Sequence, residues 1–245
     1  MFALLENIAV FILMEISGQK NILFQIFGLV PRAVFQEYKL WQTLTYLFIH
    51  GGFIHILFNM FVLWMFGKDL EIDWGKNEFL IFYFVCGIGA GLITVLISMN
   101  SFVPIVGASG AIYGVLVAYG FTYPNRIVYL YGLFPLKVKY LILGLGVIAF
   151  FASLSAAQSS VSHITHLSGM IIGIIYILFN FRWKKIRLWY IKMRIRSIQS
   201  IQNNNENEEI KTVLNELSDK GSLLLENDYE KYKIRMPDNR YGEVI

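Results

Sequence analysis

Six apolar segments, separated by polar or glycine-containing stretches, dominate the first 181 residues of the chain. They cover residues 2–16, 52–66, 78–99, 107–123, 138–156 and 162–181. A helix needs about 20 apolar residues to cross a hydrocarbon core about 30 Å thick, and the third, fifth and sixth segments meet that length. The first segment is weak, because it is short and contains Glu6 and Asn7. The pattern predicts an all-α, polytopic membrane protein with six transmembrane helices.

The composition also favours a membrane location. Hydrophobic residues make up 56% of the chain and charged residues only 16%, whereas about 25% of a soluble domain is charged. Between residues 79 and 181 the only charged side chains are Arg126, Lys137 and Lys139. The single cysteine, Cys86, offers no internal disulfide. The N-terminus lacks the charged region and cleavage site of a secretory signal peptide, so we expect it to remain part of the fold.

The distribution of basic residues predicts the orientation in the membrane. Basic residues collect on cytoplasmic loops. Seven of them follow the sixth segment: Arg182, Lys184, Lys185, Arg187, Lys192, Arg194 and Arg196. The loops at 99–106 and 156–162 contain no Lys or Arg and are expected outside, so both termini are predicted to be cytoplasmic. The net charge of +4 is interpreted as a contact with the lipid surface and not with nucleic acid.

The composition changes after the last apolar segment and predicts three regions. Residues 1–181 form the six-helix membrane domain, 182–200 a basic juxtamembrane segment, and 201–245 a cytoplasmic polar and helical tail. In the tail, helical spacing returns at four apolar positions: Ile210, Val213, Leu214 and Leu217. Gly221 is a suitable C-terminal cap for this short helix.

Polar side chains occupy the first turns of the second, fourth and sixth segments. They are His55, Asn59, Ser109 and His166. Because these three segments enter from the outside, their first turns share one level near the outer leaflet, where polar groups usually face the bundle interior or a wet cavity. The 15 residues from Ser109 to Tyr123 span about 22 Å. Ser109 should therefore lie below the outer surface of a core about 30 Å thick.

Glycines predict how a hydroxyl and an imidazole from distant segments could meet. Two stripes of small residues are present: Gly110 with Gly114, and Gly169 with Gly173. Small residues spaced by four let neighbouring helices approach closely. Such a contact would bring His166 next to Ser109, which is the arrangement that a serine nucleophile requires from its general base.

An oxyanion site is predicted beside the same serine. Ser109 lies at a helix start, where backbone N–H groups have no intrahelical partner and the helix dipole favours negative charge. The Ser109 N–H and side-chain donors from His55 and Asn59 could together hold a tetrahedral oxyanion. Because the spans place no carboxylate at this level, we expect a Ser–His dyad and not a triad.

These motifs resemble the rhomboid intramembrane serine proteases of the bacterial, six-span type. The matching stretches are GASG at 107–110, HLSG at 166–169, HGGFIHILFN at 50–59 and GKDLE at 67–71. The resemblance runs from about Trp41 to Gly173. Gln42 is a departure, because many members have an arginine there, paired to the glutamate that matches Glu71. The loss of that pair leaves the anchoring of the first loop open.

The resemblance implies an endopeptidase that cleaves transmembrane segments of membrane-protein substrates without a cofactor or metal. It implies Ser109 as nucleophile, His166 as base and packing of that base on Tyr113. His50, Gly107 and Gly110 are predicted as supporting residues. The resemblance also implies a bacterial cytoplasmic membrane, with the site open to the outer side and partly screened by segment 17–51.

Two other functions remain open at this point. A rhomboid-like pseudoprotease would bind transmembrane clients without cutting them, although the intact serine and histidine argue against it. A small transporter or metal carrier would use His50, His55, His163 and His166, all the histidines of the chain. No carboxylate or cysteine joins these histidines, and the H-x-x-H spacing lacks the glutamate of H-E-x-x-H. The oligomeric state has no signature in the sequence.

Overall fold

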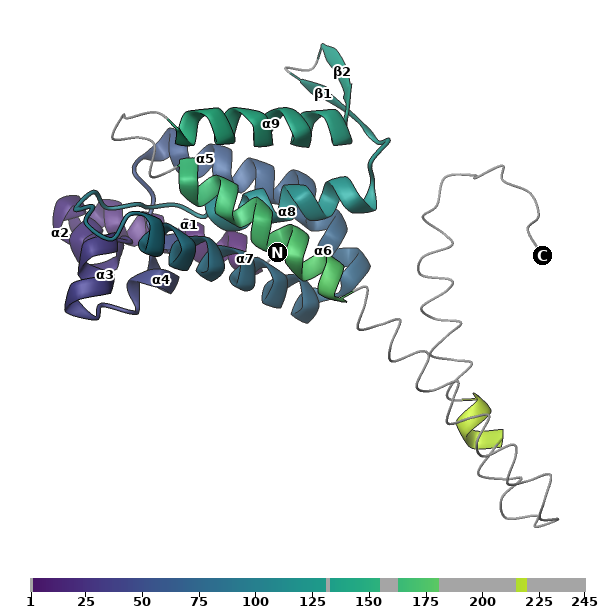
Figure 1. The fold of residues 1–245 in the computed structure, drawn as a ribbon, viewed down its shortest axis with the longest axis horizontal. Helices are drawn as coiled ribbons and strands as arrows, with labels where there is room; N and C mark the ends of the chain where they lie inside the picture. Colours follow the sequence, from purple (N-terminus) through teal and green to yellow (C-terminus); the bar gives the residue numbers. More distant parts are fainter. Residues whose placement is uncertain (1, 131–132, 155–162, 181–214, 220–245) are drawn as a thin grey trace. The chain divides into compact units, whose positions relative to one another are not determined.

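The computed structural model describes residues 2–130, 133–154, 163–180 and 215–219 (Figure 1). These residues belong to two units, Met1–Leu178 and Phe179–Ile245. In the second unit, residues 215–219 are helical and include Leu217 of the predicted tail helix. The other apolar positions of that helix, and the basic residues between 182 and 196, lie outside the described residues. The division of the chain into three regions stays a prediction.

Each of the six apolar segments contains a helix. The helices are α1 (Phe2–Ser17), the continuous rod α5–η2–α6 (Phe53–Val62, Leu63–Gly67, Lys68–Trp74), α7 (Lys76–Ile97), α8 (Ser109–Thr122), α9 (Val138–Ser153) and an unlabelled helix, His163–Asn180. Among the described residues, three helices are long and apolar enough to cross a membrane: Phe53–Trp74, Lys76–Ile97 and His163–Asn180. The prediction of a mostly helical membrane protein is confirmed, and the number of spans stays a prediction.

Two of the predicted lengths were wrong. The second helix is longer than its apolar run, because a π-helical turn at Leu63–Gly67 leads directly into the more polar α6. It ends at Gly75, where a φ of +86° interrupts the helical backbone. The fifth helix begins at Val138, as expected, but ends at Ser153 with 16 residues, three fewer than the apolar segment 138–156.

The fold is not purely helical. An antiparallel hairpin joins β1 (Ile127–Leu130) to β2 (Phe134–Lys137) between α8 and α9, with Ile127 opposite Lys137. The stretch 127–137 contains β-branched and aromatic residues that favour strands. The all-α prediction missed this hairpin because its strands are only four residues long, at the lower limit for recognising an alternating pattern.

The stretch between the first two apolar segments forms four short helices. They are α2 (Lys20–Phe27), α3 (Pro31–Glu37), α4 (Gln42–Thr45) and η1 (Tyr46–Phe48). Pro31 occupies the first turn of α3, where its missing N–H costs nothing. Leu29 and Ile105 exchange two backbone hydrogen bonds of 2.8 Å, which connect this stretch to the loop before α8.

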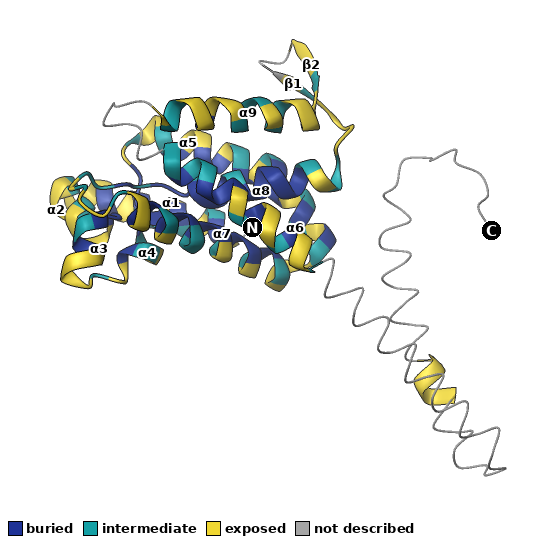
Figure 2. Ribbon diagram, in the orientation of Figure 1, coloured by how far each residue is buried: buried dark blue, intermediate teal, exposed yellow. Residues whose placement is uncertain are grey.

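Helix α8 lies at the centre of the first unit. Its side chains Ala111, Val115 and Ala118 are completely buried, and α7 packs along it. Figure 2 shows α8 in the colours of buried residues, whereas much of α9 is exposed. Because α8 is enclosed by neighbouring helices, a polar group on its first turn is shielded from lipid and faces other protein groups.

Candidate active site

Ser109 is the first residue of α8, and the residue two places before it requires glycine. Gly107 has a φ of +116°, in a region that side chains rarely adopt. A Cβ atom added at Gly107 would lie 2.7 Å from His55 Nε2, so the backbone passes directly over this imidazole. The Gly107 N–H donates to the Tyr46 carbonyl oxygen at 3.0 Å, which fixes the entry into the helix.

The predicted glycine contact between α8 and the helix His163–Asn180 is present. A Cβ atom at Gly169 would lie only 1.9 Å from the Gly110 carbonyl oxygen, and one at Gly173 would lie 3.1 Å from Gly114 Cα. The two backbones therefore touch over at least one helical turn. This approach leaves no room for larger side chains, and it sets how far His166 lies from α8.

Ser109 and His166 are in hydrogen-bond contact. The distance from Ser109 Oγ to His166 Nε2 is 2.7 Å, and the two side chains are partly buried. The imidazole of His166 lies flat on the ring of Tyr113, with centroids 4.4 Å apart and planes within 4°. This stacking limits rotation of the imidazole and holds one nitrogen toward the serine. His163 meets the same imidazole edge-on at 5.9 Å.

His55 presents an N–H group toward the loop before Ser109. Its Nδ1 accepts a hydrogen bond from the Gly51 N–H at 3.2 Å. In a neutral imidazole the other nitrogen then carries the proton, so Nε2 is a donor. Since Nε2 is the atom that a Cβ at Gly107 would meet, this donor lies close to the start of α8. It is placed where an oxyanion bound near Ser109 could accept from it.

His50 supports the loop and does not contact Ser109 directly. Its side chain is fully buried, Nε2 accepts from the Ala108 N–H at 3.5 Å, and Nδ1 lies 3.4 Å from the Phe48 carbonyl oxygen. Burial, and then the neighbouring His55 imidazole, lower the pKa of His50 to about 4, so the ring is neutral near pH 7. A neutral ring can accept at one nitrogen and donate at the other, as this geometry requires.

Asn59 is buried on the same helix as His55. Its Nδ2 donates to the His55 carbonyl oxygen at 2.8 Å, one turn back along α5. In the part of the chain that the structure describes, no hydrogen bond joins Asn59 to Ser109 or His166. The structure thus brings Ser109, His166, Tyr113 and His55 together, and leaves Asn59 one step away from them.

Tyr46 and a pair of threonines hold the elements of the site together, and neither was predicted from the sequence. Tyr46 is fully buried, its hydroxyl donates to the Gly87 carbonyl oxygen at 2.7 Å, and its own carbonyl holds Gly107. Thr94 and Thr165 share a hydrogen bond of 2.9 Å between α7 and the helix that contains His166. The sequence signal for this bond is Thr165, directly before the histidine in "THLSG". Its partner lies 71 residues away, so the pairing could not be predicted.

Gln42 anchors the first loop. Its side chain is fully buried, with Oε1 accepting from the Val30 N–H at 3.0 Å and Nε2 donating to the carbonyl oxygens of Gln25 and Ile26 at 2.8 and 3.3 Å. Trp41 adds a bond from its indole N–H to the same Ile26 oxygen at 2.9 Å. The anchoring that the sequence left open is thus supplied by amide hydrogen bonds.

The four histidines form two separate pairs. The rings of His50 and His55 lie 5.2 Å apart, and those of His163 and His166 lie 5.9 Å apart. Within the described ranges, no group of three or more His, Cys, Asp or Glu side chains has the spacing of a metal site. Ser109 and His166 form one hydrogen-bonded pair, and His55 lies beside the loop that leads to Ser109.

The fold and this site define a class: a helical integral membrane protein with a serine and a histidine paired inside its bundle. Comparison with known proteins is consistent with that class. The family model for the rhomboid domain matches residues 37–183, more than half of the chain. The chain therefore belongs to the rhomboid family.

Three relatives show the extent of the similarity. Rhomboid protease GluP of Bacillus subtilis is 29% identical over 170 residues, covering 68% of this chain and 32% of the relative. Rhomboid protease GlpG of Yersinia pestis is 29% identical over 169 residues, covering 69% and 57%. RHOMBOID-like protein 5 of Arabidopsis thaliana is 33% identical over 91 residues, covering 37% and 29%. The chain spans less than two thirds of the length of each of these relatives.

Proposed function

We propose that this protein is an intramembrane serine endopeptidase in which Ser109 is the nucleophile and His166 the general base. The observation that carries the proposal is the 2.7 Å contact between Ser109 Oγ and His166 Nε2. Membership of the rhomboid family, and the name rhomboid protease of relatives such as GluP and GlpG, support it. A structural serine would not need an imidazole clamped on an aromatic ring beside it.

The reaction follows from the positions of these groups. His166 Nε2 takes the Ser109 hydroxyl proton while Oγ bonds to the carbonyl carbon of the substrate peptide. The resulting oxyanion accepts from the Ser109 N–H and from His55 Nε2, and Asn59 is a third proposed donor through its second Nδ2 hydrogen. The tetrahedral intermediate then collapses, the C–N bond breaks, and the proton on Nε2 passes to the leaving amine. Water then attacks the ester carbonyl carbon of the acyl-enzyme while His166 Nε2 takes its proton, and the C–Oγ bond breaks as that proton returns to Ser109.

The substrate is proposed to be a transmembrane segment of another protein. Helix α8 has 14 residues, about 21 Å of helix, and begins at Ser109. If its last turn reaches the far edge of a hydrocarbon core about 30 Å thick, the serine lies several ångströms inside the membrane. A substrate must therefore present an unwound stretch within the bilayer, which small or helix-destabilising residues allow.

The topology proposed for this enzyme has six spans and both termini in the cytoplasm, in a bacterial cytoplasmic membrane. The basic residues after 181 support that orientation. The active site then opens to the outer side. Residues 1–181 are the catalytic membrane domain in this proposal, followed by the basic segment 182–200 and the tail 201–245.

A fluorophosphonate probe tests the nucleophile directly. Purified wild-type protein should be labelled on one serine, and Ser109→Ala should abolish both labelling and cleavage of a single-span reporter protein. Ser153→Ala is the matched control, since this serine on α9 donates to the carbonyl oxygen of Phe150 in its own helix. Labelling that persists in Ser109→Ala would contradict the proposal. A reporter that binds without being cut, in a protein that takes no label, would favour the pseudoprotease.

A further inference from the structure

Two threonine hydroxyls meet between α7 and the helix His163–Asn180, one residue before the proposed base. Thr94 Oγ1 and Thr165 Oγ1 lie 2.9 Å apart, and both side chains are almost completely buried. Thr94 Oγ1 also donates to the Ala90 carbonyl oxygen at 2.7 Å, one turn back along α7. This second bond holds the Thr94 side chain in one rotamer, so it offers Thr165 a partner at a fixed position.

The helix His163–Asn180 packs on α7 and α8 together (Figure 1). On α8 it touches the backbone, because a Cβ atom at Gly169 would lie 1.9 Å from the Gly110 carbonyl oxygen. On α7, a Cβ atom at Gly89 would lie 3.0 Å from Ile172 Cγ1. Glycine contacts of this kind set how closely two helices approach. They restrain rotation of a helix about its own axis less well, because a bare backbone has no side chain to interlock.

Rotation about that axis decides where the imidazole of His166 points. Successive residues of a helix differ by about 100°, so Thr165 lies about 40° to one side of Gly169 and His166 about 60° to the other. Thr165 thus faces α7, and His166 faces Ser109. A rotation of about 10° would move a group about 6 Å from the axis by about 1 Å. A displacement of that size can cost about 10²-fold in rate.

We propose that the hydrogen bond between Thr94 and Thr165 positions the base: it fixes the rotation of this helix and so directs the imidazole of His166 toward the serine. This role rests on the proposed function, since the direction of an imidazole matters to the rate only where it serves as a base. Stacking on Tyr113 restrains the imidazole ring itself, whereas the threonine bond restrains the helix that carries it. The two threonines act through His166 and take no part in the bond changes of the reaction.

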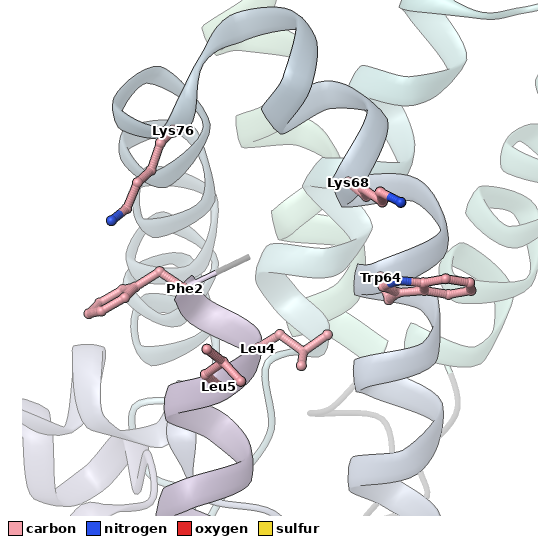
Figure 3. A pocket seen from close by; sticks show the side chains of 6 residues that line it. All are labelled: Phe2, Leu4, Leu5, Trp64, Lys68 and Lys76. Carbon is pink, nitrogen blue, oxygen red and sulfur yellow. The ribbon is translucent and has the colours of Figure 1, made fainter.

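A second hydrogen bond joins the same helix to α7 farther from the site. Tyr176 Oη donates to Glu78 Oε1 at 2.8 Å. Glu78 lies near the first turn of α7, where Lys76 Nζ lies over the ring of Phe2 (Figure 3). Tyr176 follows His166 by ten residues, about 15 Å along the helix. Tyr176→Phe therefore removes a bond between the same two helices without disturbing the neighbourhood of the base, which makes it a matched control.

Steady-state cleavage of a single-span reporter tests the positioning role. Thr165→Val keeps the shape of the side chain and removes its hydroxyl, so kcat should fall about tenfold while KM stays unchanged. Thr94→Val should have the same effect, and the double variant should be no slower than either single variant, because each change removes the same bond. Thr165→Ser keeps the hydroxyl and should retain kcat. Wild-type kcat in Thr165→Val, or an equal loss in Tyr176→Phe, would overturn the proposal.

Imidazole nitrogen resonances test the same point without proteolysis. In full-length protein with isotope-labelled histidine, Ser109→Ala removes the hydrogen bond to His166 and identifies its Nε2 signal. In Thr165→Val this signal should move toward its position in Ser109→Ala, and in Tyr176→Phe it should keep its wild-type position. An unchanged signal in Thr165→Val contradicts the positioning role. Failure of the proposed function would look different: the wild type would take no fluorophosphonate and cut no reporter, while the signal would still respond to the threonines.

Discussion

The first and last turns of α8 are held in place by different kinds of interaction. At the first turn, Ser109 contacts the imidazole of His166, and Gly110 lies against the backbone of a neighbouring helix. Around the last turn, Tyr119 and Tyr123 donate to the carboxylates of Asp69 and Asp73. Arg126 then forms an ion pair with Asp69 at 2.5 Å.

In the proposed enzyme, the difference follows from what each end of α8 must do. A nucleophile inside the bundle needs a base that is neutral until it takes a proton, and a fixed charge nearby would shift that balance. Charges are also costly within the hydrocarbon core and tolerable near its surface. The site end is therefore positioned by shape and neutral hydrogen bonds, whereas the far end uses ionic groups.

The largest expected effect comes from breaking the pair at the first turn. His166→Asn should lower cleavage of a transmembrane reporter by at least about 10³-fold, because no other base is hydrogen-bonded to Ser109 in the described part of the chain. Thermal unfolding in detergent, followed by circular dichroism, should be nearly unchanged. His163→Asn is the matched control, and it should keep most of the activity. Comparable losses in the two variants would mean that the imidazole of His166 has no special role.

Gly169→Ala tests whether shape alone holds the two helices at the required distance. The added methyl group would lie 1.9 Å from the Gly110 carbonyl oxygen, so the helices must separate, at an expected cost of about 3 kcal/mol in the free energy of unfolding. Cleavage of the reporter should also fall, because the separated helices no longer hold His166 against Ser109. Gly144→Ala on α9 is the control, because nothing lies within 4 Å of its Cβ position. If both variants unfold at the same temperature, the close contact is not what positions His166.

Gln42→Leu tests the neutral anchor of the first loop. The change removes three side-chain hydrogen bonds and leaves the Val30 N–H without its partner, which should cost about 2 kcal/mol. Limited proteolysis between residues 20 and 35 should accelerate. Gln19→Leu, at an exposed position, should change neither property. The effect of Gln42→Leu should not depend on salt, and a strong dependence on ionic strength would contradict the hydrogen-bond account.

Asp69→Asn should have the smallest effect. The pair with Arg126 is partly exposed, with side-chain accessibilities of 29% and 52%, so its loss should cost no more than about 1 kcal/mol. The unfolding temperatures of the wild type and of Asp69→Asn should differ at low salt and converge at high salt. Cleavage of the reporter should remain. Arg126→Gln should lower the free energy of unfolding by a similar amount. The double variant should be little less stable than either single variant. A large loss of activity in Asp69→Asn would show that the two ends of α8 are coupled.

Much of the helical arrangement could be predicted from hydrophobicity. Each of the six apolar segments contains a helix, because continuous apolar runs of this length are stable only when the backbone bonds to itself. The limits were less accurate where a change in composition did not coincide with the end of a helix. The helix from Phe53 continues through polar α6 to Gly75, and the short hairpin at 127–137 interrupts no apolar run.

The candidate site could be predicted in its residue types more than in its contacts. Ser109 and His166 stand out because polar groups are rare inside spans, and the glycine spacing indicated which helices meet. The tautomer of His55 depends on the Gly51 N–H, and the position of Gly107 depends on the Tyr46 carbonyl oxygen. These bonds are formed by backbone atoms, which have no signature in the residue pattern.

The sequence by itself determined which side chains could do chemistry, how far each sits along its helix, and that the chain belongs in a membrane. Those properties depend on residue identity and on spacing within single segments. The tertiary structure decided that the imidazole of His166 meets the hydroxyl of Ser109, and that the Gln42 amide bonds the backbone of the first loop. These depend on where separate helices cross, which is determined by packing between residues distant in the chain.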